Sequence, residues 1–136
     1  MKFNQKTIHA ITLCTKLNQQ DLISLNQLSI EMDVSKVYLE QVARPLKNAN
    51  IITATLGPKG GYQLLTHPNN ISILKIVQLF ESTLFEKTQL ENTIEHQSIM
   101  KTMITPFDSH ILKFFESITL QDFINNKQSD SLMFYI

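Results

Sequence analysis

Side chains able to bind nucleic acid are concentrated in residues 35–50 of this 136-residue sequence. Gln41 can form two hydrogen bonds with the edge of an adenine, and Glu40 can accept a hydrogen bond from a cytosine amine. Three cations in the same stretch are suited to neutralising backbone phosphates, namely Lys36, Arg44 and Lys47. This combination predicts contact with both the bases and the backbone of a DNA duplex. A solvated helix face of mixed charge is the alternative, so the assignment depends on the elements that hold these side chains.

A helix-turn-helix is predicted around these side chains. Ser24 and Gln27 have the spacing of a capping box, and they open a helix whose apolar stripe consists of Leu25, Leu28 and Met32. A tight turn at 33–34 leads to Ser35, which is a favourable N-cap for a second helix. That helix directs four residues inward, Leu39, Val42, Leu46 and Ala49. The side chains outside this stripe are the candidate DNA contacts on the second helix: Ser35, Lys36, Val37, Tyr38, Glu40, Gln41, Arg44 and Lys47.

A glycine-rich hairpin, or wing, is predicted directly after the second helix. Residues 51–55 are rich in β-branched side chains, and residues 62–65 form the expected partner strand. All three glycines of the protein lie between them, at Gly57, Gly60 and Gly61. With Lys59 at its tip, such a wing is suited to a phosphate or a minor groove. The alternatives are an ordinary hairpin and a nucleotide-binding loop, and the second fits poorly because those loops lead from a strand into a helix.

Two helices are predicted between the wing and residue 104. Ser72 caps the first helix, which directs four residues inward, Ile73, Ile76, Val77 and Phe80. Residues 84–104 form the second helix, with Thr88 and Glu91 as its cap, and its apolar periodicity is poor.

A long helix near the C-terminus is predicted to join two subunits. Thr105 and Pro106 mark its start, because proline is favoured at the first helical position, and it extends over about 106–118. Its apolar side chains wrap more than one face, and a partner subunit is a natural place to bury them. The candidate dimer contacts are Phe107, Ile111, Phe114, Phe115 and Ile118. A last short helix, capped by Thr119 with Asp122, is expected to run through Phe123.

The single cysteine, Cys14, lies in a predicted N-terminal helix over residues 5–18, on one apolar stripe with Ile8, Ile11 and Leu17. A lone cysteine is a candidate redox switch, but on an apolar stripe it more often behaves as a small buried hydrophobic residue. One cysteine forms no intrachain disulfide and no metal-cluster ligand set, so a cytoplasmic location is the default expectation. His96 and His110 have no partners at ligand spacing, so no metal site is expected either.

The charge of the chain is neutral overall but unevenly distributed. Residues 1–66 contain seven Lys or Arg against four Asp or Glu, and residues 67–136 contain five against eight. The basic half therefore coincides with the helix-turn-helix and the wing. The length allows one compact domain or a small domain with an oligomerising arm, and no apolar run is long enough to span a membrane. No nucleophile–base pair, paired carboxylates or metal motif is evident, so an enzyme is not expected.

Three motifs in residues 34–81 occur in an order and spacing that resemble a known family. They are SKVYLEQ from Ser35 to Gln41, GPKGGYQL over 57–64, and ISILKIVQ after the wing. This pattern resembles the Rrf2 family of bacterial winged-helix regulators, with residues 83–106 unmatched. The resemblance implies a homodimer with crossing C-terminal helices that binds a palindromic promoter site and usually represses. By motif, it assigns DNA contacts to Ser35, Tyr38, Glu40 and Gln41 on the helix and to Gly57, Lys59, Gly60 and Gly61 on the wing.

Three positions depart from the family pattern. Cluster-binding members carry three cysteines between the post-wing helix and the dimer helix, whereas residues 84–106 contain none, so no iron–sulfur cluster is expected. Leu56 stands where family wings often carry a groove-binding arginine, which puts the usual sequence specificity in doubt. Asn50 replaces a glycine at the end of the recognition helix, a mild change because asparagine tolerates the left-handed conformation.

The sequence therefore predicts a mainly α-helical protein with a small β-hairpin wing. Residues 1–83 are expected to form a winged helix-turn-helix DNA-binding domain, and residues 84–136 an effector and dimerisation region. The expected function is sequence-specific DNA binding by a homodimeric repressor that responds to an unidentified redox or small-molecule signal. The alternative is a winged-helix protein-interaction module without specific DNA binding, which the neutral charge and Leu56 favour.

Overall fold

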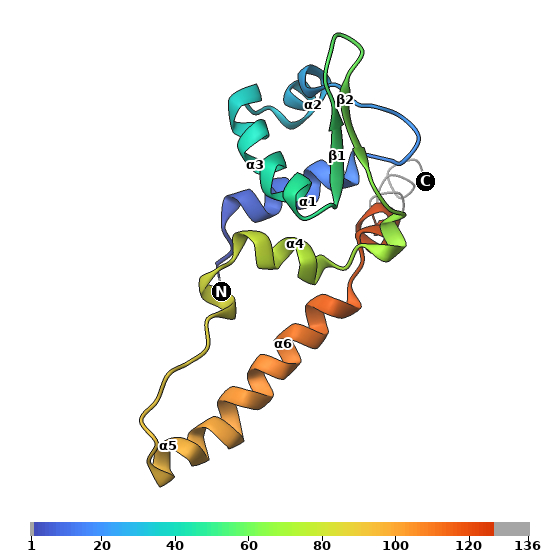
Figure 1. The fold of residues 1–136 in the computed structure, drawn as a ribbon. Coiled ribbons are helices and arrows are strands. Elements are labelled where there is room, and N and C mark those ends of the chain that lie inside the picture. Colours follow the sequence, from blue (N-terminus) through green and yellow to red (C-terminus); the bar gives the residue numbers. More distant parts are fainter. Residues whose placement is uncertain (1, 127–136) are drawn as a thin grey trace, which may run out of the picture.

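The computed structural model describes residues 2–126, and Figure 1 shows a body of helices and a hairpin from which one helical arm extends. The body contains α1 (Gln5–Thr15), α2 (Leu25–Met32), α3 (Lys36–Asn48), the antiparallel strands β1 (Ile52–Thr55) and β2 (Gly61–Leu64), and α4 (Ile73–Phe80). The arm contains α5 (Ile94–Ile99), a π-helical turn (Met100–Ile104) and α6 (Thr105–Ser117). Short 3-10 helices lie at Pro68–Asn70 and Thr83–Phe85, and residues 120–126 are helical. The predicted mainly helical fold with a two-stranded wing is confirmed.

Both helices of the helix-turn-helix start where the sequence predicts. The Oγ atom of Ser24 accepts a hydrogen bond from the N–H of Gln27 at 3.1 Å, and that of Ser35 accepts one from the N–H of Tyr38 at 3.1 Å. Each hydroxyl satisfies a backbone donor that the first helical turn leaves free. Between the helices Asp33 adopts a φ of 53°, which ends α2 in the left-handed conformation. Local interactions therefore set the position of α3 relative to α2.

The wing is held by α3 at one end and by the segment before α2 along one edge. Asn50 leaves α3 with a φ of 59°, in the left-handed conformation that the sequence predicts for it. The strands then pair with Ile52 opposite Leu64. Ile23 exchanges backbone hydrogen bonds with Tyr62 of β2, at 2.8 and 3.0 Å. The hairpin is thus attached to both helices of the helix-turn-helix.

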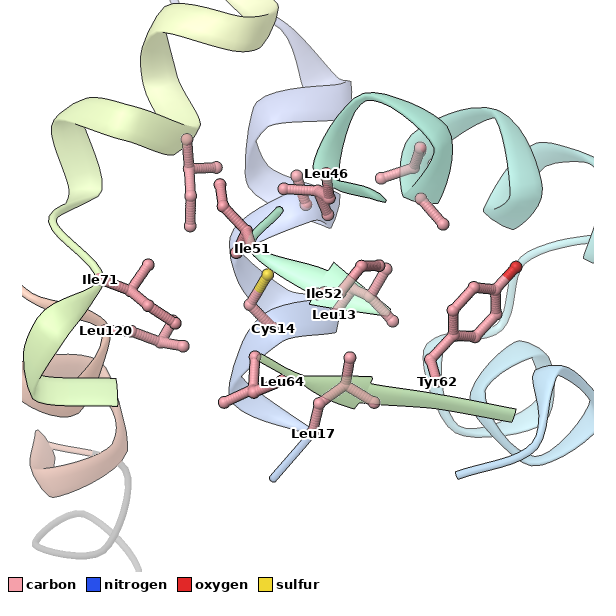
Figure 2. Packing of buried hydrophobic residues seen from close by; sticks show 14 of the residues in the cluster. Leu13, Cys14, Leu17, Leu46, Ile51, Ile52, Tyr62, Leu64, Ile71 and Leu120 are labelled. Atoms are coloured by element: carbon pink, nitrogen blue, oxygen red, sulfur yellow. The ribbon is translucent and has the colours of Figure 1, made fainter. Parts of the chain in front are cut away.

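The hydrophobic core lies where α1, α3 and the hairpin meet, as Figure 2 shows. Leu13 and Cys14 of α1 are fully buried in it, together with Leu46 of α3. Ile71 and Leu120 belong to the same cluster, so the segment after the arm also packs on the body. A single core therefore supports the exposed surfaces of α3 and of the wing.

The buried face of α1 differs from the predicted stripe. Cys14 and Leu17 are buried as predicted, but Ile8 is exposed and α1 ends at Thr15. Thr7 lies inside instead, because its hydroxyl donates a hydrogen bond of 2.7 Å to the carboxylate of the buried residue Glu81. A polar side chain with a buried partner can occupy a core position that a pattern of apolar residues does not indicate.

The first helix of the arm begins later than the sequence predicts, and it is continuous with the predicted long helix. It is capped by Thr93, whose hydroxyl accepts a hydrogen bond from the N–H of His96 at 3.1 Å, so the predicted cap at Thr88 is wrong. The predicted start at Thr105 and Pro106 coincides with the start of α6, but no side chain caps it, because the backbone is already helical from α5 through the π-helical turn into α6. Proline lacks a backbone N–H and its ring crowds the preceding turn, and the wide π-helical turn directly before it provides the room.

The arm is fastened to the body at its C-terminal end. The N–H of Ile73 donates to the carbonyl of Ile118 at 2.8 Å, and the N–H of Leu120 donates to the carbonyl of Ile71 at 2.9 Å. These bonds form a short antiparallel bridge beside the start of α4. The chain therefore leaves the body after α4, runs out along a coil at 86–92 and returns through α6 to the place where α4 began, as Figure 1 shows.

Candidate nucleic-acid interface

Helix α3 has one buried apolar face and one exposed polar face. Leu39, Val42 and Leu46 are fully buried against the body. The candidate DNA contacts on the opposite side are exposed, apart from Tyr38: Ser35, Lys36, Val37, Glu40, Gln41, Arg44 and Lys47. Donors and acceptors suited to base edges and phosphates therefore project away from the core, as a recognition helix requires.

Tyr38 is half-buried, and its hydroxyl lies 2.6 Å from Nδ1 of His9 on α1. The two rings meet edge to face, with centroids 5.2 Å apart and an interplanar angle of 84°. Burial raises the pKa of the Tyr38 hydroxyl. The contact ties the first turn of α3 to α1 and orients the Tyr38 side chain. Sequence reasoning missed His9, because no local pattern signals a partner 29 residues away.

The conformation and packing of the wing explain why each of its three glycine positions excludes a larger residue. Gly57 adopts a φ of 109°, which side-chain-bearing residues rarely do. A Cβ atom on Gly60 would lie 2.0 Å from the carbonyl oxygen of Thr55, and one on Gly61 would lie 2.4 Å from that of Ile23. The glycines therefore permit a thin, tightly turned hairpin, and none of them requires an external ligand to explain it.

A groove of about 480 Å³ separates α3 from the wing. Helix α3 contributes three of the candidate contacts to its wall, Glu40, Arg44 and Lys47. Residues 54–58 and 60–62 form the opposite wall, and Ser24 and Leu25 at the start of α2 also line it. Burial, and then the nearby carboxylate of Glu40, raise the pKa of the Tyr62 hydroxyl in this groove. Sequence analysis did not indicate the α2 residues, since they adjoin the wing only through the fold.

The cations of this surface form no salt bridge within the part of the chain that the structure describes. Within residues 2–126 the salt bridge present joins Lys16 to Glu31, with a nitrogen–oxygen distance of 3.9 Å. The four cations on α3 and the wing form no ion pair with any residue in that range: Lys36, Arg44, Lys47 and Lys59. Free cations beside a groove are the arrangement that binds a phosphate backbone.

The predicted dimer contacts divide into exposed and internal side chains. Phe107 and Phe114 are 54% and 58% exposed on α6. Ile111 and Ile118 are half-buried against the core of the body. Phe115 is only 7% exposed, because its ring packs against two phenylalanine rings of the body. Of the predicted dimer contacts, only Phe107 and Phe114 therefore remain largely exposed.

Cys14 is fully buried, and burial raises the pKa of its thiol to about 12. The thiol is thus protonated at neutral pH and shielded from reagents, the opposite of a reactive cysteine. No group of three or more potential metal-ligating side chains occurs in the described part of the chain. None of the helices described is long and apolar enough to cross a membrane.

Comparison with known sequences identifies a family of transcriptional regulators that this chain matches. The Rrf2 family, described as iron-dependent transcriptional regulators, matches residues 3–126. The transcriptional regulator CymR of Bacillus subtilis is 27% identical, over 100% of both chains. The transcriptional regulator IscR of Cereibacter sphaeroides is 26% identical, over 93% of this chain and 89% of the relative.

Solved structures share the fold of the arm as well as that of the body. The structure of CymR, described as the global cysteine regulator of B. subtilis, superimposes with a TM-score of 0.77 at 23% identity, covering 93% of this chain and 98% of that one. The oxidised form of Staphylococcus aureus CymR gives a TM-score of 0.70 at 30% identity, covering 91% and 96%. These coverages extend through the region that sequence motifs left unmatched.

Proposed function

This chain belongs to the Rrf2 family of transcriptional regulators, and from that premise we propose that it is a homodimeric repressor that binds a palindromic operator. The family consists of DNA-binding regulators rather than enzymes. Relatives of this chain are named as helix-turn-helix transcriptional regulators, and the body of this chain contains a winged helix-turn-helix. The finer features of the proposal concern how the two subunits and the DNA fit together.

The observation that carries the proposal is the unpaired cationic surface around the groove between α3 and the wing. Arg44 and Lys47 line the groove, and Lys36 and Lys59 are exposed on its two elements. A surface whose cations pair with no carboxylate in residues 2–126 is positioned to replace the counterions of a DNA backbone.

In the proposed complex α3 enters the major groove and the wing contacts the adjacent minor groove. Gln41 and Glu40 contact base edges, and Val37, which is exposed in the first turn, packs against a thymine methyl group. The cations hold phosphates and so set the register of the protein along the duplex. Ser35 and the glycines at 57, 60 and 61 contribute close backbone contacts.

The dimer in this proposal forms through the outer side of the arm. Phe107 and Phe114 are the largest exposed apolar side chains on α6, and Met103 extends the same kind of surface toward the π-helical turn. Exposed apolar area of this extent is typical of a surface that another subunit covers. Two bodies joined in this way would present their α3 helices one helical turn of DNA apart, or a multiple of it.

A DNA-selection experiment tests the docking. The protein is incubated with a random pool of duplexes, and the bound fraction is sequenced to define an operator. On that operator Gln41→Ala should relax the base preference, costing about 1–3 kcal/mol of discrimination, whereas Lys59→Ala should weaken binding for all sequences and lower the salt slope by about 1. If neither substitution changes binding, the docking is wrong.

Light scattering tests the dimer independently of DNA. A mass of two chains is expected at micromolar concentration, and a mass of one chain would remove the two-site mechanism. Selection that returns no preferred sequence, with retention on DNA that does not depend on salt, would instead support the alternative function as a protein-interaction module. The zero net charge and Leu56 are the observations that favour that alternative.

The signal that releases the operator is, in this proposal, a small molecule bound beside the arm. A hollow of about 920 Å³ lies between residues 88–92 and the arm helix, and Met100 and Lys101 of the π-helical turn line it. Oxidation of Cys14 is disfavoured as the signal, because a buried protonated thiol reacts slowly. Candidate metabolites should raise the Tm of the wild type, and Ser109→Trp, which fills the hollow, should abolish the increase. DNA release by oxidant that Cys14→Ser abolishes would favour the redox signal instead.

A further inference from the structure

We propose that Leu56 determines specificity by selecting A·T base pairs in the minor groove where the wing docks. The proposal rests on the DNA docking described above and adds the class of base pair that the wing accepts. Packing in the body does not explain why a leucine occupies this position at the wing tip.

Leu56 is 95% exposed, the most exposed of the large hydrophobic side chains in the described part of the chain. It follows Thr55, whose partner across the hairpin is Gly61, so it is the first residue beyond the paired strands. It does not belong to the hydrophobic core cluster, and it lines the groove that α3 and the wing enclose. Its side chain therefore contributes to the surface that faces DNA and not to the stability of the hairpin.

The wing tip around Leu56 is thin. Gly60 and Gly61 have no room for a Cβ atom, and Gly57 has a backbone conformation that favours glycine. The bulk of the turn therefore comes from Leu56, Pro58 and Lys59 alone. A tip of this cross-section suits the minor groove, which is only about 6 Å wide.

The chemistry of leucine discriminates between the two kinds of base pair in that groove. A G·C pair presents the N2 amine of guanine there, whereas A·T and T·A pairs present only acceptors. Leucine offers no acceptor, so packing it against the amine removes water from a donor without replacing the lost hydrogen bond. Against an A·T pair the side chain contacts the sugar walls of a narrower groove.

Lys59 supports the same selection from the other side of the turn. A·T-rich segments have a narrow minor groove with enhanced negative potential, which attracts a cation placed at its mouth. Lys59 is exposed and forms no ion pair with any residue of the described chain. An apolar side chain that excludes the guanine amine and a cation that favours the narrow groove thus act in the same direction.

The test uses modified bases that change the minor groove and leave the major groove intact. An operator defined by selection with wild-type protein is synthesised with A·T, G·C, inosine·C or diaminopurine·T pairs at the positions under the wing. Diaminopurine adds the N2 amine to an A·T-like pair, and inosine removes it from a G·C-like pair. We expect G·C and diaminopurine·T each to weaken binding about tenfold, and inosine·C to restore the affinity of A·T.

Substitutions assign the effect to the side chain. Leu56→Ala should reduce the tenfold penalty to about twofold, and Leu56→Asn should remove it, because the amide oxygen can accept from the added amine. Leu65→Ala is the matched control: Leu65 is an exposed leucine just after β2, away from the tip, and its loss should leave the penalty unchanged. Circular dichroism of each variant checks that the fold is retained.

The outcomes separate this inference from the proposed function. Selective binding that is indifferent to diaminopurine would overturn the inference and leave operator binding intact. A diaminopurine penalty that persists at full size in Leu56→Ala would assign the selection to DNA shape and would also overturn it. Failure to select any sequence would overturn both proposals, and a purified protein partner whose affinity falls in Leu56→Ala would then identify the other occupant of the wing.

Discussion

The body of this molecule buries most of its large apolar side chains, whereas the arm leaves several of them exposed to solvent. In the body, leucines and isoleucines from α1, α3, α4 and both strands converge on one core, and most of them are less than 5% exposed. In the arm, residues 94–117 carry large apolar side chains that remain in solvent, among them Ile94, Met103, Phe107 and Phe114. The exposed side chains of the arm therefore form the kind of surface that the proposed dimer would cover.

The two regions should respond differently to substitution. Substitutions in the core of the body should change the free energy of unfolding of one chain, and substitutions on the outer side of the arm should change association. A substitution where the arm meets the body should change both the free energy of unfolding and the association of subunits. Neighbouring positions on α6 provide the sharpest comparison, because Phe114 and Phe115 are adjacent in sequence and opposite in burial.

The largest effect is expected for Phe115→Ala. The Phe115 ring packs with centroids 6.0 Å from Phe3 and 6.4 Å from Phe85, so its loss leaves a cavity and should destabilise the chain by about 3–5 kcal/mol in urea unfolding. Phe114→Ala is the matched control, and it should cost less than about 1 kcal/mol in the monomer while weakening the dimer in sedimentation experiments. Equal destabilisation by the two substitutions would contradict the division into body and arm.

The second effect concerns the reactivity of thiols in the two regions. Because burial raises the pKa of Cys14 from 9.0 to about 12, its thiolate fraction at pH 7 falls roughly a thousandfold, and its reaction with an aromatic disulfide reagent should slow by at least that factor relative to the unfolded chain. Ser109→Cys places a thiol on the exposed arm and should react at the rate of a free thiol. Similar rates at both positions would show that the body opens readily.

The raised pKa of Cys14 also predicts how stability depends on pH. Below pH 9 both the folded and the unfolded chain hold the proton, so the contribution to stability is fully present. Between pH 9 and about 12 only the unfolded chain releases it, so the free energy of unfolding should fall by up to about 1.4 kcal/mol per pH unit. Urea unfolding of wild type and Cys14→Ala at pH 8 and pH 10.5 measures this, and the variant should lack that component of the fall.

A smaller effect is expected where the chain leaves the body for the arm. Glu81 is buried at the end of α4, and its carboxylate accepts hydrogen bonds from the N–H of Asn4 and the hydroxyl of Thr7. Glu81→Gln keeps the shape but replaces charge-assisted bonds with neutral ones, which should cost about 1–2 kcal/mol in unfolding experiments. Glu86→Gln, on the exposed coil, should change stability by less than about 0.5 kcal/mol. If both substitutions are neutral, the buried carboxylate does not fix α1.

The smallest effect is expected within the arm itself. Pro106→Ala restores a backbone donor and removes the reason for the π-helical turn, so the arm helix should become more regular. The change in stability of one chain should be within about 1 kcal/mol, because few body contacts depend on this turn. Hydrogen exchange at residues 100–106 should slow, and unchanged exchange would mean that the turn does not arise from the proline.

The sequence predicts the body well because its signals are local. Ser24 and Ser35 mark helix starts by hydrogen bonds that span three residues, and Asn50 takes the left-handed conformation at the end of α3. The glycines between residues 57 and 61 are confined to a turn for steric reasons that act within a few ångströms. The fold class and the exposure of the candidate contacts on α3 follow from features of this kind.

The errors fall where distant contacts outweigh local preference. Ile8 is a good apolar candidate for the inner face of α1, but the hydroxyl of Thr7 has a carboxylate partner 74 residues away. The partnership of His9 with Tyr38 likewise exists only because α1 packs on α3. None of these contacts has a signature in neighbouring residues.

The bridge that joins residues 71–73 to residues 118–120 has a consequence for how such regulators can diversify. The bridge holds the two ends of the arm segment together on the body, so that this segment forms a closed loop. The position of its two ends on the body therefore does not depend on how far the loop extends. Doubling the length of a flexible loop adds only about 0.6 kcal/mol to its closure cost. The outer part of the arm, beyond side chains such as Phe115 that pack on the body, can thus be lengthened, shortened or given new side chains for a different signal while the DNA-binding body keeps its structure.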